Sequence, residues 1–243
     1  MSRTLRTLVS LLALVTIGAV LPPGAAPVSA DEQAPKTGSQ RVALIGASGR
    51  VGSRVLAELV SRGHTVTGIA RTPANIATGP NVTAVAGDVT EPEALAAVLT
   101  GHDAVISAVP FAVTDPDALI GAVRASGVKR YIVVGGAASL INADGVMLAD
   151  TPELSMLKTM AEPAGGIAFL EALRPVTDLD WTFFSPAVNF APGQRTGVFR
   201  LGGDQVVLDA SGESRISMED YAIALVDVLE NPRHIRQRFT AGY

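Results

Sequence analysis

Three glycines between a predicted strand and a predicted helix constrain the fold of this chain more than any other feature. Gly46, Gly49 and Gly52 follow the apolar run 42–45 and lead into a helical pattern over 51–61. In such a turn, the first glycine permits the tight bend, the second lets amides approach a pyrophosphate, and the third lets the helix pack closely on the strand. The anion then lies at the helix N-terminus. We therefore expect a dinucleotide to contact Gly46, Ala47, Ser48, Gly49, Arg50, Val51 and Gly52; the alternative is a glycine turn without a ligand.

The first 30 residues have the pattern of a secretory signal peptide. Arg3 and Arg6 precede the apolar run 8–20, and a proline–glycine segment leads to small residues that end at Ala30. The apolar run is shorter than the roughly 20 residues that a spanning helix needs, so we expect no stable membrane anchor. We interpret residues 31–40 as a polar linker and 41–243 as one domain. The mature protein is then secreted or extracytoplasmic, or cytoplasmic if translation starts further downstream.

Composition excludes several classes of function. The chain has no cysteine, so it has no disulfide framework, no thiol nucleophile and no lipid-modified cysteine. Its formal net charge is −4, and removal of the predicted signal peptide takes away Arg3 and Arg6 but no acid. This charge argues against a nucleic-acid partner. We also predict no metal site, because no His, Asp or Glu residues have metal-ligand spacing, and we expect the isolated histidines to be structural: His64, His102 and His234.

Short apolar strands alternate with helices along the rest of the chain. We expect strands at 41–45, 65–70, 82–86, 104–107, 131–134, 181–184 and 238–240, and helices at 51–61, 90–99, 115–126 and 218–230. Thr90 with Glu93, and Ser217 with Asp220, are the expected helix caps. Strands this apolar belong to a parallel sheet that helices cover on both faces. The predicted fold is therefore α/β, a doubly wound parallel sheet (Rossmann fold), with a small hairpin-like insert at 197–212 on the substrate side.

The end of the second predicted strand indicates the choice of cofactor. In NAD-preferring sheets, an acidic residue there binds the ribose hydroxyls, but this chain has Arg71. A guanidinium pairs with a 2′-phosphate, so we predict that NADP(H) is preferred over NAD(H), unless Arg71 is only a solvated surface residue. Asp88 and Val89 follow the third predicted strand. We expect them either to contact the adenine ring or to form a turn in which Asp88 binds its own backbone. Further contacts are expected at the ends of the fourth and fifth strands, from Ala108, Val109 and Pro110 for the cofactor and from Gly135 and Gly136 for the substrate.

The sequence offers no obvious proton donor for the reaction. A Tyr-x-x-x-Lys motif, which supplies a phenol in short-chain dehydrogenases, is absent, and no other catalytic residue is identified. Its absence argues against carbonyl reduction and sugar epimerisation, and favours a flavin or quinone acceptor that needs little help from a protein acid. Several aromatic and proline residues lie near the predicted strand ends. They either line a flat apolar substrate pocket or belong to the hydrophobic core: Phe111, Trp181, Phe184, Pro186 and Phe190.

Two tracts carry a resemblance to a known family. Residues 42–53 and the long tract 181–222 resemble the NADH-flavin reductases, which are atypical short-chain dehydrogenases related to biliverdin reductase B and to NmrA-like proteins. The resemblance covers about 41–243. It implies a monomer or weak homodimer that binds NAD(P)H and reduces a small-molecule, flavin-like acceptor. The loop 192–197 then closes over the nicotinamide with Arg195 facing a phosphate or an anionic acceptor, unless Arg195 pairs with a carboxylate instead.

Two other functions stay open. One is an NmrA-like sensor of the cofactor redox ratio that binds without turnover, which the missing Tyr-x-x-x-Lys supports. The other is a nucleotide-sugar epimerase or dehydratase, which the same absence disfavours.

Overall fold

A long, mostly parallel sheet is the framework of the molecule. The structure, a computed structural model, describes residues 28–29 and 38–243. Seven strands run parallel in the order β4-β3-β2-β5-β6-β7-β11. Their bounds are β2 (Arg41–Ile45), β3 (Thr65–Ala70), β4 (Val82–Ala86), β5 (Ala104–Ser107), β6 (Arg130–Val134), β7 (Asp180–Ser185) and β11 (Gln237–Gly242). Strand order reverses between β2 and β5, which confirms the predicted doubly wound sheet.

Two antiparallel strands extend one edge of this sheet. Strand β9 (Val198–Gly202) pairs with β11, and the short β1 (Val28–Ser29) pairs with β9. A separate parallel pair joins β8 (Asn189–Ala191) to β10 (Arg215–Ser217). The rest of the predicted signal peptide, and all of the predicted linker before Gly38, lie outside the described residues.

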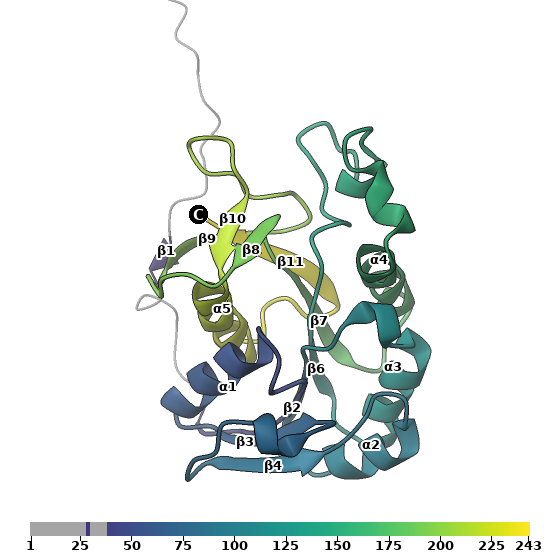
Figure 1. Cartoon of the computed structure of the whole chain (residues 1–243), viewed down its shortest axis with the longest axis vertical. Helices are drawn as coiled ribbons and strands as arrows, with labels where there is room; N and C mark the ends of the chain where they lie inside the picture. Colours follow the sequence, from purple (N-terminus) through teal and green to yellow (C-terminus); the bar gives the residue numbers. More distant parts are fainter. Residues whose placement is uncertain (1–27, 30–37) are drawn as a thin grey trace, which may run out of the picture.

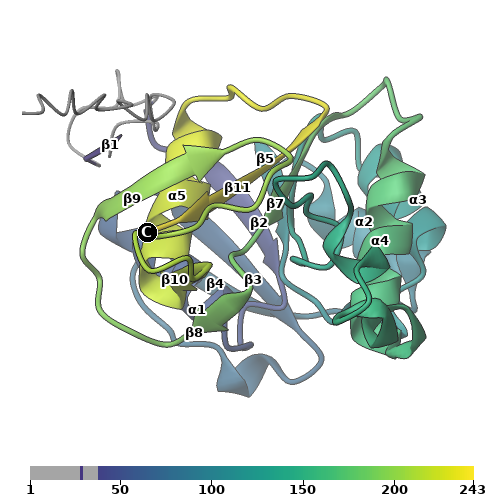
Figure 2. The same ribbon diagram turned by 90° about the horizontal axis from the view of Figure 1, so that it is seen from above.

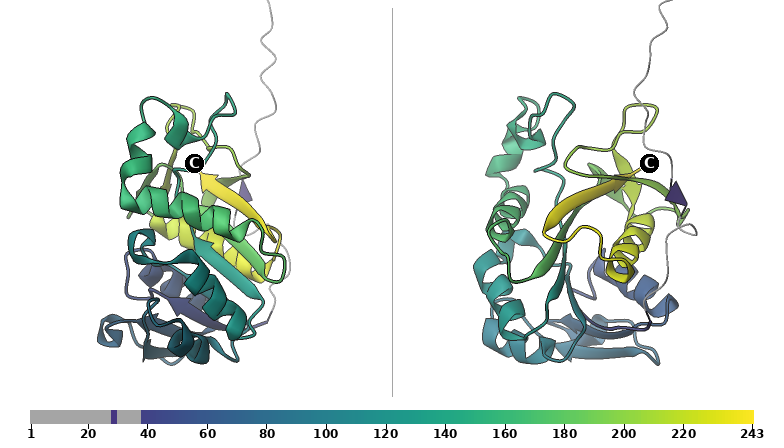
Figure 3. Two further views of the ribbon diagram at one scale, coloured as in Figure 1. Left: turned by 90° about the vertical axis from the view of Figure 1, so that its right-hand side faces the viewer. Right: turned by 180° about the vertical axis from the view of Figure 1, so that it is seen from behind.

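Helices cover both faces of the sheet (Figures 1 and 2). Helices α1 (Gly52–Ser61) and α5 (Met218–Glu230) pack on one face, and α2 (Pro92–Leu99), α3 (Pro116–Ala125) and α4 (Ala161–Leu173) pack on the other. Short 3-10 helices interrupt the loops at η2 (Pro73–Asn75), η3 (Phe111–Val113), η4 (Leu148–Asp150) and η5 (Ser155–Thr159). Figure 3 shows β11, in yellow, running next to α5 at the end of the chain.

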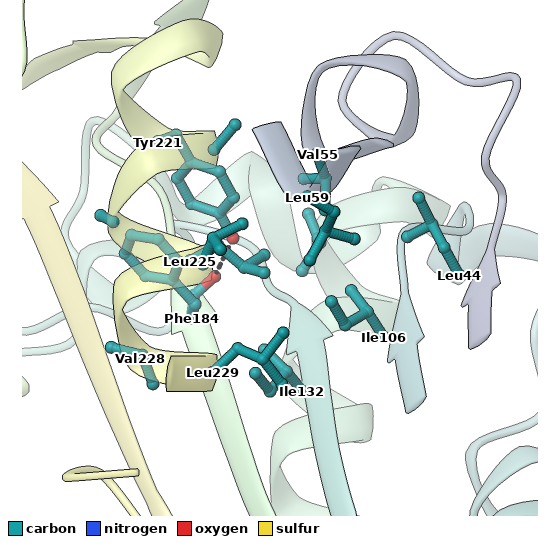
Figure 4. Close-up of a cluster of buried hydrophobic side chains, with 14 of the residues drawn as sticks. Leu44, Val55, Leu59, Ile106, Ile132, Phe184, Tyr221, Leu225, Val228 and Leu229 are labelled. Atoms are coloured by element: carbon teal, nitrogen blue, oxygen red, sulfur yellow. Dashed lines mark hydrogen bonds between the residues drawn. The ribbon is translucent and has the colours of Figure 1, made fainter. Parts of the chain in front are cut away.

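The alternation of side chains along the strands builds a core on each face. On the first face, Leu44 and Ile106 of the sheet meet Val55 and Leu59 of α1 (Figure 4). Tyr221 of α5 stacks on Phe184 in the same core, and its hydroxyl donates to the backbone oxygen of Phe184 (2.6 Å). The second core contains residues of β2, β5 and β6 together with residues of α2, α3 and α4. Both faces are therefore buried, as the apolar strands predict.

Three local predictions were wrong. Helix α2 begins at Pro92 after Glu91, so Thr90 does not cap it; proline fits the first turn because it has no N–H to satisfy. The segment 197–212 is no hairpin, because β9 joins the main sheet and 206–208 form no strand. Helix α4 was not predicted, since Pro163, Gly165 and Gly166 obscure its helical pattern. The predicted cap at Ser217 is confirmed, since its side chain accepts from the amide of Asp220, and Asp115 caps α3 in the same way through the amides of Asp117 and Ala118.

Candidate dinucleotide and acceptor clefts

A cleft of about 300 Å³ lies at the carboxyl ends of β2, β3, β4 and β5, beside the point where the strand order reverses. We call it the cofactor cleft. Open α/β sheets bind their ligands at this position. Its lining residues are Ile45, Gly46, Ser48, Gly49, Ile69, Ala70, Arg71, Gly87, Asp88, Val89, Thr90, Ala108, Val109, Pro110 and Val113.

The glycine turn forms one wall of the cofactor cleft. Gly46 has a φ of +82°, and a Cβ there would lie 2.3 Å from the backbone oxygen of Ala108. A Cβ on Gly52 would lie 2.0 Å from the backbone oxygen of Gly46. Real atoms do not approach so closely, so only glycine lets β5 and the start of α1 come this near to the turn. Two of the predicted roles, the tight bend and the close helix packing, are therefore confirmed.

The N-terminus of α1 has no negatively charged partner of its own. Val51 is its N-cap and provides no side-chain cap, and its first turn has no acidic residue. The first amides of a helix lack acceptors within the helix, and the helix dipole adds positive potential at this end. A helix start of this kind is suited to an anion, which can accept from the amides that have no acceptor within the helix.

Arg71 lies at the end of β3 on the rim of the same cleft. Its side chain is exposed, and its guanidinium forms no ion pair or hydrogen bond with any residue that the structure describes. Asp88 lies nearby. Its carboxylate accepts from the amide of Thr90 (3.0 Å), and this bond is the main reason that the pKa of Asp88 is lowered, with a smaller contribution from the charge of Arg71. Asp88 thus shapes its own turn, while Arg71 is available to an anion.

A second cleft of about 370 Å³, which we call the acceptor cleft, is lined by residues that follow β5 and β6 and by the start of α4. Pro110 lines the cofactor cleft and the next residue, Phe111, lines the acceptor cleft. Phe111 packs on Phe169 and Phe183, with ring centroids 5.4 and 6.0 Å apart. The carboxylate of Glu162, in the first turn of α4, accepts from the amides of Phe111 (3.1 Å) and Ala112 (2.8 Å). These bonds fix the segment that joins the two clefts.

Most of the predicted contact residues line these clefts, but not all of them. Gly46, Ser48, Gly49, Arg71, Asp88, Val89, Ala108, Val109 and Pro110 line the cofactor cleft, and Phe111, Gly135 and Gly136 line the acceptor cleft. The four other residues of the glycine segment, Ala47, Arg50, Val51 and Gly52, support the turn from outside this lining. Pro186 is buried and lines neither cleft, and Trp181, Phe184 and Phe190 belong to the aromatic and hydrophobic packing of the core.

Arg195 lines neither cleft, so of its two expected roles the contact with a phosphate or an acceptor is not seen. Its guanidinium pairs with Glu58 of α1 (3.0 Å), on the face of the sheet covered by α1 and α5. The loop around it is held in place, since the amides of Thr196 and Gly197 donate to the buried Asp220 (2.7 and 2.8 Å). The alternative interpretation, a structural loop whose arginine pairs with a carboxylate, fits this geometry.

The clefts contain no phenol. All three tyrosines of the chain are described, and none lines either cleft. Tyr131 and Tyr221 are fully buried, which raises the pKa of both hydroxyls. The hydroxyl of Tyr243 donates a hydrogen bond to the carboxylate of Asp220 (2.8 Å). In the described part of the chain, no group of three or more His, Asp or Glu side chains is placed to hold a metal ion.

Comparison with known proteins identifies the family. A family model described as NAD(P)H-binding matches residues 46–232, which include the glycine turn and most of both clefts. The chain belongs to this NAD(P)H-binding family. The match agrees with the open α1 N-terminus, and it places the chain among proteins of one fold that differ in the reaction they carry out.

Three solved structures are similar to the chain over nearly all of their own length. A "putative exported protein" from Burkholderia pseudomallei is 44% identical, with a TM-score of 0.76 over 84% of this chain and 100% of that chain. A "putative epimerase" from Bacteroides thetaiotaomicron is 40% identical, with a TM-score of 0.79 over 84% and 97%. A "putative NADH-flavin reductase" from Streptococcus pneumoniae TIGR4 is 34% identical, with a TM-score of 0.71 over 84% and 99%. The resemblance to NADH-flavin reductases and the Rossmann fold are confirmed.

Sequence reasoning missed several cleft residues. Ile69, Ala70, Gly87 and Thr90 directly flank predicted residues at strand ends, so extending each prediction by one or two positions would have found them. Most of the acceptor cleft carried no such signal. Its remaining walls come from the long segment between β6 and β7 and from Val188, and only tertiary packing brings them together: Ala137, Ala138, Leu148, Leu154, Leu157, Glu162, Pro163 and Val188.

Proposed function

We propose that this protein is an NADPH-dependent oxidoreductase that transfers hydride to a small flavin- or quinone-like acceptor. The observation that carries the proposal is the uncapped N-terminus of α1, which opens into a cleft that continues along Pro110 and Phe111 into a second, apolar cleft. Membership of the NAD(P)H-binding family supports the cofactor, and the likeness to a "putative NADH-flavin reductase" supports the type of acceptor.

Each cleft has a separate task. The turn 46–52 and the first amides of α1 hold the pyrophosphate, and Arg71 pairs with the 2′-phosphate. Bound NADPH supplies the hydride and its two electrons. The apolar walls of the acceptor cleft orient a flat ring and exclude water. Since neither cleft contains a phenol, the acceptor takes its proton from solvent, which suits a flavin or quinone better than a simple carbonyl.

The preference for NADPH is tested with Arg71→Ala. A charge-assisted hydrogen bond contributes about 1.5–3 kcal/mol, so we expect NADPH affinity to fall roughly ten- to a hundredfold and NADH affinity to change little. Calorimetry with both coenzymes measures this. Arg124→Ala is the control, since Arg124 is also exposed but pairs with Asp178 on the surface beside α3. An unchanged ratio of the two affinities in Arg71→Ala would refute the preference.

Turnover is tested by stopped-flow loss of nicotinamide absorbance. We expect NADPH oxidation to accelerate when riboflavin or a soluble quinone is added. A redox sensor is the second candidate, because all three tyrosines lie away from the clefts. Tight binding of both NADPH and NADP⁺ without turnover on any flavin or quinone favours the sensor. Epimerisation of a nucleotide sugar lacks the phenol it needs, although one relative is described as a "putative epimerase".

We also propose that the protein acts outside the cytoplasm. The pattern of residues 1–30 and the likeness to a "putative exported protein" support this location. No helix in residues 28–29 and 38–243 has the length and apolar character needed to cross a bilayer. Cell fractionation with sequencing of the mature N-terminus tests export; an intact N-terminus in the cytoplasmic fraction contradicts it.

A further inference from the structure

We propose that the acceptor is an uncharged flat ring with an apolar substituent, such as a prenylated quinone, and that an anionic flavin nucleotide is a poor substrate. This inference rests on the proposed reductase function and narrows its substrate class. Three features of the acceptor cleft support it: the charge of its walls, the pairing of the neighbouring cations, and the character of its rim.

The walls of the acceptor cleft carry a single ionisable group, the carboxylate of Glu162. Its two bonds to the amides of Phe111 and Ala112 hold that carboxylate at a fixed place in the wall. A phosphate in this cleft would therefore face a fixed negative charge; Glu162 is exposed, so solvent screens part of this repulsion, but no cation in the cleft lining offsets it. An uncharged ring avoids this repulsion.

The cations near the cleft are already paired. Lys158 follows Leu157 on η5, but its ammonium pairs with Asp150. Arg238 lies behind the cleft wall with its side chain only 1% exposed, where its guanidinium pairs with Asp204 and donates to the backbone oxygen of Ser139. Arg238 is thus held inside the protein, and Lys158 lines neither cleft and already has a carboxylate partner at the surface, in contrast to Arg71 on the lining of the cofactor cleft.

The rim of the acceptor cleft is apolar where a surface is normally polar. The amide of Leu157 donates to the backbone oxygen of Leu154, and the amide of Met160 to that of Leu157, so the 3-10 pattern of η5 extends to both flanking residues. Residues three apart in this geometry share a face, so Leu154, Leu157 and Met160 form one row just before α4. Leu154 and Leu157 line the cleft, Met160 continues the row at 50% exposure, and Val188 on the lining is 49% exposed. Methionine adapts to irregular apolar ligands, and such an exposed patch marks a binding surface. We assign it to the apolar substituent.

The reaction balances with groups that are already named. The quinone accepts a hydride, with its two electrons, from NADPH and one proton from solvent. The products are the hydroquinone and NADP⁺.

Steady-state NADPH oxidation with paired acceptors tests the inference. Riboflavin and FMN have the same isoalloxazine ring system, and FMN differs only in its phosphate. We therefore expect kcat/KM for riboflavin to exceed that for FMN by about tenfold or more. A quinone with one prenyl group should exceed the same quinone without it by about tenfold, which corresponds to the burial of about two of its carbons. Glu162→Gln should bring the riboflavin and FMN values closer together.

The rim is tested with Met160→Glu, which should remove most of the advantage of the prenylated quinone while NADPH affinity is retained. Val198→Glu is the matched control, since Val198 is similarly exposed (49%) but lies on β9, well away in the strand order. FMN turnover equal to that of riboflavin, or a prenyl advantage that survives Met160→Glu, overturns the inference. No turnover with any acceptor, despite NADPH binding, contradicts the reductase function itself.

Discussion

At the residue scale, two glycines of the same segment illustrate how tightly the turn is built. Gly46 needs its positive φ, whereas Gly52 needs the absence of a side chain, because the backbone oxygen of Gly46 occupies the place of a Cβ. The pyrophosphate site depends on both, since it uses the amides that follow this bend.

Gly52→Ala is expected to lose NADPH binding and to destabilise the fold, because the new methyl would force α1 away from the turn. Gly121→Ala is the matched control: Gly121 lies inside α3, nothing lies within 4 Å of a Cβ there, and alanine should stabilise that helix by about 0.5–1 kcal/mol. Chemical denaturation and coenzyme titration of both variants measure these effects. Normal NADPH affinity in Gly52→Ala would contradict the role of the close approach.

The residues that sequence could predict are those with a motif at a strand end. The glycine segment and Arg71 were found because the Rossmann pattern fixes their positions relative to the strands. Arg195 was misplaced because its loop carries no rule for which face of the sheet it covers, and its partner Glu58 is 137 residues away in the sequence. Glu162 was also missed, because the residues whose amides it binds, Phe111 and Ala112, are likewise far from it in the sequence.

At the scale of elements, a buried ionic cluster joins α1 to α5. Arg62 follows α1, and its guanidinium contacts Glu58 (2.8 Å), Asp227 (2.6 Å) and Glu230 (2.9 Å), all of them buried. Nε2 of His64 also lies 3.2 Å from Glu230. Glu58 also pairs with Arg195 (3.0 Å), so two arginines share the three carboxylates, and Arg62 is the arginine that reaches Asp227. Burial and the neighbouring carboxylates raise the pKa of Asp227, against the effect of Arg62.

Arg62→Met should destabilise the protein by about 3–5 kcal/mol, because it removes the arginine partner of the buried Asp227. The pKa of Asp227, which burial already raises, then rises further above its value in the unfolded chain, so the folded state binds more protons and stability falls as pH increases through that range. We therefore expect a larger deficit at pH 8 than at pH 5. Urea unfolding at both pH values measures it, with Arg124→Met as an exposed control expected to cost less than about 1 kcal/mol. A deficit independent of pH would contradict this account.

The strands were easier to predict than the elements that form the acceptor cleft. Short apolar runs of four to six residues, bounded by turn residues, predicted the observed ranges of β2, β3, β4 and β5. The segment between β6 and β7 contains η4, η5 and α4, and its glycines and prolines mask the periodicity by which helices are recognised. Its structure depends on contacts with Phe111 and η3, which no local pattern reveals.

At the scale of the whole molecule, the strand order explains why the two clefts are neighbours. The order reverses between β2 and β5, so the loops that follow these strands diverge to opposite faces and leave the cofactor cleft between them. The loops after β5 and β6 then supply Phe111, Gly135 and Gly136 to the acceptor cleft. The fold thus places the proposed coenzyme site and an apolar site side by side. This arrangement is suited to direct transfer of a hydride from one bound molecule to the other.

Calorimetric titration of the purified protein with NADPH, at fixed ionic strength, tests the central claim most directly. The account predicts saturable binding at one site per chain, with NADH binding more weakly because it lacks the phosphate that pairs with Arg71. The absence of saturable binding for both coenzymes would contradict the assignment of the α1 N-terminus as a pyrophosphate site, and with it the proposed reaction.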